Sequence, residues 1–152
     1  MNKNDAKASQ TLLNDILANE SVLLMQTLNY HWNLVGPEFH DYHLLFDKQY
    51  KEIFEHMDDI AERVRAVQGV ALGSFKNILS LATLHEDTGK TPNPKQMIVN
   101  LLKQYEKLIE QIREAIAALD KKSTDFGTIN FLEDLIMQHE KTAWMLRSLA
   151  TK

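Results

Sequence analysis

The chain has 152 residues, of which 44% are hydrophobic and 25% are charged, and its formal net charge at pH 7 is −4. That length suits a single domain with a sizeable core and is short for two domains. Because the chain contains no cysteine, disulfides, thiolate zinc sites and cysteine nucleophiles are excluded, and the acidic charge balance argues against a general phosphate-binding surface.

The sequence also indicates where the protein works. No apolar run approaches the roughly twenty residues of a membrane-spanning helix, and the first ten residues, MNKNDAKASQ, are polar. We therefore expect a cytoplasmic protein without a membrane partner, built as one domain over residues 1–152. A short polar tail, about residues 1–7, is expected before the first helix.

A first long helix is predicted over about residues 8–35, because apolar residues recur three and four positions apart along it. His31 continues the apolar face, so it is either a hydrogen-bonded core histidine or a ligand. Residues 33–37 are predicted to reverse the chain, since Gly36 is free to take a positive φ. The apolar residues that define the face are Leu13, Ile16, Leu17, Leu24 and Leu28.

A second long helix, predicted over about residues 37–67, carries two pairs of potential metal ligands. His43 and Asp47 are four positions apart, as are Asp58 and Glu62, so each pair projects from one helix face. Imidazole nitrogen and carboxylate oxygen together suit iron, manganese or zinc. The eleven residues from Asp47 to Asp58 correspond to roughly 16 Å of helix, which is too far for one ion. One helix therefore offers two half-sites.

Two half-sites on one helix become complete if a second copy packs antiparallel across a two-fold axis near Glu52 or Ile53. His43 and Asp47 of one chain would then face Asp58 and Glu62 of the neighbouring chain, and two equivalent sites would form. The alternative is that histidine and acidic residues at this spacing lie on a solvated helix face. Phe54 and Ala61 share the same side of the helix, and that mixture favours a subunit contact.

The connection over residues 68–93 is long for a compact domain. A short helix is predicted within it, with the Ser74 hydroxyl as its N-cap. Because a second helix of about thirty residues is roughly 45 Å long, the length is explained if the connection returns along the bundle before the third long helix begins.

A third long helix is predicted over residues 94–120, with Asn93 as N-cap and Pro94 at its first position. A fourth is predicted over about residues 125–149. His139 lies in the inner stripe of this last helix and is expected to be a hydrogen-bonded core residue. The fold class is therefore all-α: a four-helix bundle with a long crossover, containing a short helix, between the second and third long helices.

The ligand spacing resembles that of the Dps family of mini-ferritins, over nearly the whole chain. The similarity consists of the sequence HWN at His31, twelve positions from His31 to His43, then Asp47, the sequence DDIAER that holds Asp58 and Glu62, and GVALG after it. The resemblance implies a ferritin-like bundle that assembles into a hollow homododecamer, with iron-oxidising sites at its two-fold interfaces.

The resemblance further implies that Fe(II) is oxidised at these sites, with hydrogen peroxide as the preferred oxidant. Ferric mineral would collect inside the shell and protect the cell against oxidative damage. Glu62 would be the bridge if a second iron or a water joins the pair. Trp32 either supplies an electron or simply packs. The implied iron ligands are His31, His43 and Asp47 of one chain with Asp58 and Glu62 of its two-fold mate.

Three acidic residues near the start of the last helix, Asp125, Glu133 and Asp134, resemble the lining of the three-fold pores by which iron enters such shells. A ring of carboxylates concentrates cations. The alternative is an ordinary acidic helix start favoured by the helix dipole.

Other functions were weighed against this one. An ordinary ferritin, a bacterioferritin or a manganese catalase would use Glu-x-x-His pairs inside one bundle, and no histidine here has Glu three positions before it. A DNA-compacting, nucleoid-associated protein remains an alternative, although Lys3 and Lys7 at one end and Arg147 and Lys152 at the other are few. The third possibility is a helical module that only assembles subunits and whose acidic residues bind no metal.

Overall fold

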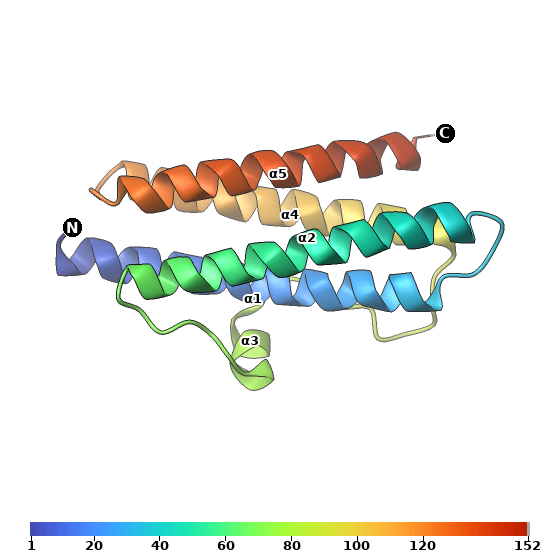
Figure 1. Ribbon diagram of the computed structural model, residues 1–152, viewed down its shortest axis with the longest axis horizontal. Coiled ribbons are helices and arrows are strands. Elements are labelled where there is room, and N and C mark those ends of the chain that lie inside the picture. Colours follow the sequence, from blue (N-terminus) through green and yellow to red (C-terminus); the bar gives the residue numbers. More distant parts are fainter. Residues whose placement is uncertain (152) are drawn as a thin grey trace.

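Helices are the only regular secondary structure among residues 1–151, which are the residues that the computed structural model describes. Four long helices lie side by side as a bundle, and the short α3 lies outside it, beside α1 (Figure 1). The helices are α1 (Lys3–Asn33), α2 (Phe39–Ala66), α3 (Phe75–Leu81), α4 (Pro94–Asp120) and α5 (Phe126–Ala150). This arrangement confirms the predicted all-α, ferritin-like architecture with a crossover between α2 and α4.

The core lies along the axis of the bundle and is built from apolar residues at helical spacing. On α2, the side chains of Phe46, Ile53 and Ile60 are fully buried, and each is seven positions from the next. Removing one such side chain from water stabilises the fold by about 1.5–3 kcal/mol. None of the long helices within residues 1–151 has the apolar stretch that crossing a bilayer requires.

Side-chain caps mark the starts of α3 and α4, whereas α2 begins without a side-chain cap. The hydroxyl of Ser74 and the side chain of Asn93 accept hydrogen bonds from the backbone N–H three residues later, at 3.2 and 2.9 Å, which confirms both predicted caps. α2 begins at Phe39 rather than at Pro37, and Gly36 adopts the expected positive φ of 127°.

The expected tail at residues 1–7 is wrong, because α1 already begins at Lys3. Asn2 caps it by accepting from the N–H of Asp5 at 2.9 Å. Asp5 is buried and accepts from the backbone N–H of Thr124 at 3.0 Å and from its hydroxyl at 2.9 Å. The hydrogen bond from the backbone N–H of Thr124 is the largest cause that holds the pKa of Asp5 below its usual value, and the bond from the Thr124 hydroxyl is the next. The first turn of α1 is thereby fixed to the connection between α4 and α5.

Buried polar side chains of α1 hold the crossover against the bundle. Asn19 accepts from the N–H groups of Thr83 and Leu84 at 2.8 and 3.0 Å, and Gln26 accepts from the N–H of Asp87 at 2.6 Å. A buried backbone N–H without an acceptor is costly. The side-chain oxygens of Asn19 and Gln26 therefore explain why an irregular segment can lie along α1.

Candidate metal centre

Two histidines meet where the end of α1 faces the start of α2. The rings of His31 and His43 stack with centroids 3.9 Å apart and planes 12° from parallel. His31 Nδ1 lies 3.0 Å from the carbonyl oxygen of His43, and His43 Nδ1 lies 2.9 Å from that of His31. Since a carbonyl only accepts, each Nδ1 carries the proton and each Nε2 keeps its lone pair. This is the tautomer that a metal ligand needs.

Aromatic neighbours keep the two imidazoles in place. The ring of Phe39 stacks on His43 with centroids 4.8 Å apart, and Tyr50 meets His31 edge-on at 5.2 Å. His31 is only 8% exposed. The predictions of His31 as a core residue and as a ligand are compatible, because the residue is buried while its Nε2 has no hydrogen-bond partner among residues 1–151.

Asp47 follows His43 by one turn of α2. Its carboxylate accepts from Lys51 Nζ at 2.7 Å and from the hydroxyl of Tyr50 at 3.2 Å. The hydrogen bond from Lys51 is the main cause that lowers the pKa of Asp47. The side chain of Lys51 is 62% exposed, so it can leave the carboxylate when a cation arrives.

Asp58 and Glu62 are exposed farther along α2. Asp58 lines a groove of about 480 Å³ between α2 and α3, whose other lining is mainly apolar. Phe54 and Phe75, which also line it, are 62% and 81% exposed. Within the described part of the chain, neither carboxylate belongs to a cluster of three or more potential ligands. His31, His43 and Asp47 form no such cluster either among residues 1–151, so metal binding by these five residues stays a prediction.

The three acidic residues assigned to a pore differ in environment. Asp125 is only 5% exposed and caps α5. Its carboxylate accepts from Ser9 at 2.7 Å and pairs with Arg63 at 2.7 Å, so the helix-cap alternative describes Asp125. Glu133 and Asp134 are exposed, and a pore role stays a prediction for these two residues alone.

The two tryptophans are both largely exposed. Trp32 is 62% exposed and Trp144 is 58% exposed. Trp144 therefore lies on the surface of the chain and not in its core. A redox role of Trp32 stays a prediction.

One cluster was missed by sequence reasoning. Glu20 on α1, His56 on α2 and His139 on α5 place one donor atom each within 4.8 Å of one another. His139 was expected to be a fully hydrogen-bonded core residue, but its Nδ1 is buried without a partner. No spacing along the sequence signals this group, because its members come from three helices whose register is set only by packing.

Comparisons with known proteins agree with this architecture. Residues 10–152 match the model of the ferritin-like domain family. A low temperature-induced protein of Nostoc sp. is 42% identical over 137 residues, covering 90% of this chain and 76% of that protein. The DNA protection during starvation protein 2 of Bacillus anthracis is 32% identical over 138 residues, covering 90% and 92%.

Solved structures are similar over almost the full length. A Dps protein from Bacillus brevis superposes with a TM-score of 0.93 at 28% identity, covering 99% of this chain and 100% of that one. The Dps protein of Vibrio cholerae O1, described as a member of a broad superfamily of ferritin-like diiron-carboxylate proteins, gives a TM-score of 0.94 at 28% identity, covering 99% and 94%.

Proposed function

The chain belongs to the Dps family of ferritin-like proteins, and from that membership we propose that it is a ferroxidase that oxidises Fe(II) between two subunits and stores the ferric product. The observation that carries the proposal is the division of donors along α2. Imidazoles with free Nε2 atoms lie at one end, and the exposed carboxylate of Asp58 lies fifteen positions after His43, roughly 22 Å farther along the helix.

The surroundings of the second half-site support a subunit contact. Phe54 and Phe75 are large apolar side chains left exposed beside Asp58, and such patches mark interaction sites more often than open surface. A copy packed antiparallel on this face would cover them and would bring His31, His43 and Asp47 of one chain to Asp58 and Glu62 of the other.

The donor set suits iron as substrate. Two imidazoles and three carboxylates combine nitrogen and oxygen donors that hold both ferrous and ferric ions. The carboxylates also balance the charge that builds up as ferrous ions lose electrons. Hydrogen peroxide takes up two electrons, one from each of two ferrous ions, so a site that binds two ions avoids the release of hydroxyl radical.

Assembly into a hollow shell, with twelve chains, belongs to the same proposal. A closed shell would give the ferric product a protected volume, and the exposed Glu133 and Asp134 would concentrate cations if they surround a channel through it. Native mass measurement tests the subunit count.

Stopped-flow oxidation of Fe(II), with hydrogen peroxide and with oxygen in parallel, tests the proposed activity. We expect peroxide to be the faster oxidant. We also expect Asp58→Asn to lower the initial rate at least tenfold, on the order of the 10–100-fold losses found at metal-site positions. The matched control is Asp59→Asn, which removes an exposed carboxylate one position away on α2. Equal rates for the two variants would refute the assignment of Asp58.

DNA binding is a second candidate, favoured by the name of the Bacillus anthracis relative. The net charge of −4 opposes it, because affinity for DNA depends on Lys and Arg that neutralise phosphates. A gel-shift experiment on plasmid at low salt distinguishes the two. Retardation that disappears with added salt would support DNA binding, and its absence would remove this second candidate.

A further inference from the structure

A polar cluster lies in the middle of the bundle, away from the interface ligands. It consists of Glu20, His56 and His139, which we call the inner triad, from α1, α2 and α5. Glu20 and His139 have no exposed surface, and His56 is half-buried. Glu20 Oε1 pairs with His139 Nε2. Titratable groups at such depth require partners.

The hydrogen bonds of the inner triad are incomplete. Glu20 Oε2, His56 Nδ1 and His139 Nδ1 are buried and have no partner within the described part of the chain. His56 Nε2 lies 2.7 Å from the side-chain oxygen of Gln138, so this nitrogen donates and Nδ1 keeps the lone pair. A carboxylate oxygen and an imidazole lone pair left free in a buried cluster are acceptors without a donor. A cation would satisfy both.

We propose that the inner triad binds one divalent transition-metal ion, separate from the iron sites between subunits. Two neutral imidazoles and one carboxylate are a donor set that suits zinc or ferrous iron. Ligands with bonds of about 2.0–2.1 Å stand roughly 3.3 Å apart around a tetrahedral ion, and the donors of the triad already lie within 4.8 Å of one another. To close the site, these side chains would rotate toward the ion.

The sequence around the two histidines argues for one ion rather than two. In two-metal ferritin-like bundles, a glutamate stands three positions before each ligand histidine. Here Ile53 and Ile136 occupy those positions before His56 and His139. Ile53 is fully buried and Ile136 packs against the core, so neither position offers a carboxylate to a second ion.

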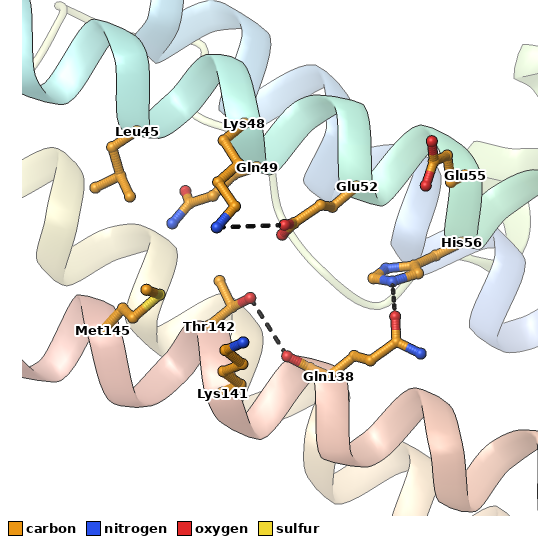
Figure 2. A pocket seen from close by; sticks show the side chains of 10 residues that line it. All are labelled: Leu45, Lys48, Gln49, Glu52, Glu55, His56, Gln138, Lys141, Thr142 and Met145. Carbon is orange, nitrogen blue, oxygen red and sulfur yellow. Dashed lines mark hydrogen bonds and ion pairs between the residues drawn. The ribbon is translucent and has the colours of Figure 1, made fainter.

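A cleft reaches one member of the inner triad, His56, from the surface. A cavity of about 340 Å³ opens between α2 and α5, and His56 and Gln138 form part of its lining together with Gln49 and Glu52 (Figure 2). In Figure 2, His56 reaches from α2 toward Gln138 on α5, across the gap between the two helices. A fourth ligand, either water or the Gln138 oxygen, can come from this side. Charges of both signs line the cleft, since Lys48 lies 3.8 Å from the Glu52 carboxylate and Lys141 faces it from α5.

The position of the inner triad suggests what the ion does. α2 and α5 have few direct contacts along their length, and both histidines project into the space between them and α1. One ion bound to all three helices would hold α2 against α5, so the site is expected to stabilise the bundle.

Cobalt(II) titration tests the proposal, since Co(II) takes zinc-type sites and absorbs visible light. The background is a His43→Ala/Asp47→Asn/Asp58→Asn/Glu62→Gln variant of the full chain, which keeps only His31 of the five proposed interface ligands. We expect about one Co(II) per chain, with the intense d–d bands of a four-coordinate ion. His56→Gln in this background should abolish the bands. His40→Gln, which changes an exposed histidine of the same helix, should retain them.

Thermal unfolding gives an independent measure of the same site. Zn(II) should raise the Tm of the background protein and of His40→Gln but not that of His56→Gln, because an ion that binds only the folded state stabilises it. His56 is half-buried, so its replacement should leave far-UV circular dichroism unchanged. Equal Co(II) stoichiometry in both histidine variants, or no Tm shift in the background protein, would overturn the inner site. Neither readout depends on iron oxidation, so the two proposals stand or fall separately.

Discussion

At His31 and His43, the hydrogen bond on one ring nitrogen determines the chemistry of the other. Each Nδ1 donates to the carbonyl of the facing histidine, so both Nε2 atoms are available as ligands without any change of tautomer. The spacing along the sequence predicts these residues as ligands. It does not predict that they stack on each other and fix each other's tautomer, because that requires the chain reversal at Gly36 to bring the two helix ends together.

Replacing His43 by Phe distinguishes the packing of the aromatic ring from the role of its nitrogen as a metal ligand. His43→Phe keeps an aromatic ring against Phe39 and His31 but removes the ligand nitrogen. We expect the initial rate of ferrous oxidation to fall by at least tenfold, measured by stopped-flow absorbance. His40→Phe, at an exposed position of the same helix, is the control. A His43→Phe rate close to that of the control would show that His43 is not a ligand.

For Asp125, unlike for the two histidines, the sequence pattern did not indicate the environment that the structure shows. Sequence pattern placed it among pore acids, but three-dimensional neighbours determine its role. Burial alone would raise the pKa of Asp125. The hydrogen bonds from Ser9 and Thr128, together with Arg63, more than offset burial, so the pKa is lowered. A lowered carboxyl pKa in the folded state means that the charged form stabilises the fold.

Asp125→Asn should therefore destabilise the protein in a pH-dependent way. At pH 7 we expect a loss of about 1–3 kcal/mol, as for hydrogen bonds to a charged group. The difference between the two proteins should be complete above the unfolded-state pKa of about 3.9 and should disappear as pH falls through the lower folded-state pKa. Urea unfolding across pH 3 to 7 measures it. A difference that is constant with pH would contradict the ionised pairing with Arg63.

At the scale of elements, helix ends depend on short local signals, and these were largely predictable. Ser74 and Asn93 cap α3 and α4 as the sequence indicates. The start of α1 was not predicted: Asn2 caps it by accepting from the N–H of Asp5, and the Asp5 side chain is held by the distant Thr124. The end of α2 depends on Gln68, which adopts a positive φ of 64° while the N–H of Gly69 bonds to Val64 at 2.9 Å.

Gln68→Gly should stabilise the end of α2. A left-handed residue directly after a helix favours glycine, since any side chain there is strained. We expect a gain of about 0.5–1 kcal/mol in the free energy of unfolding, visible as a higher urea midpoint. Gln68→Ala keeps the strain of a side chain and should not show this gain. A lower midpoint for Gln68→Gly than for Gln68→Ala would contradict the left-handed helix end.

At the scale of the whole molecule, the bundle was predictable, but the inner triad was not. A crossover returning along the bundle follows from the length of α2 and of residues 68–93, and the structure confirms it (Figure 1). The relative rotation of α1, α2 and α5, which brings Glu20 to the two histidines, is set by side-chain packing and leaves no periodic trace. Packing between two chains remains a proposal, based on the exposed carboxylates and the apolar groove at Asp58.

The most direct measurement for the central proposal is complementation between two inactive variants. One variant carries His43→Ala and Asp47→Asn, and the other carries Asp58→Asn and Glu62→Gln. Each alone should oxidise ferrous iron slowly. After co-refolding, a mixed dimer places the intact half-sites of both chains at one interface site, so random pairing should restore roughly a quarter of the wild-type sites. If the mixture has no more activity than the two variants measured separately, the iron site does not span two chains.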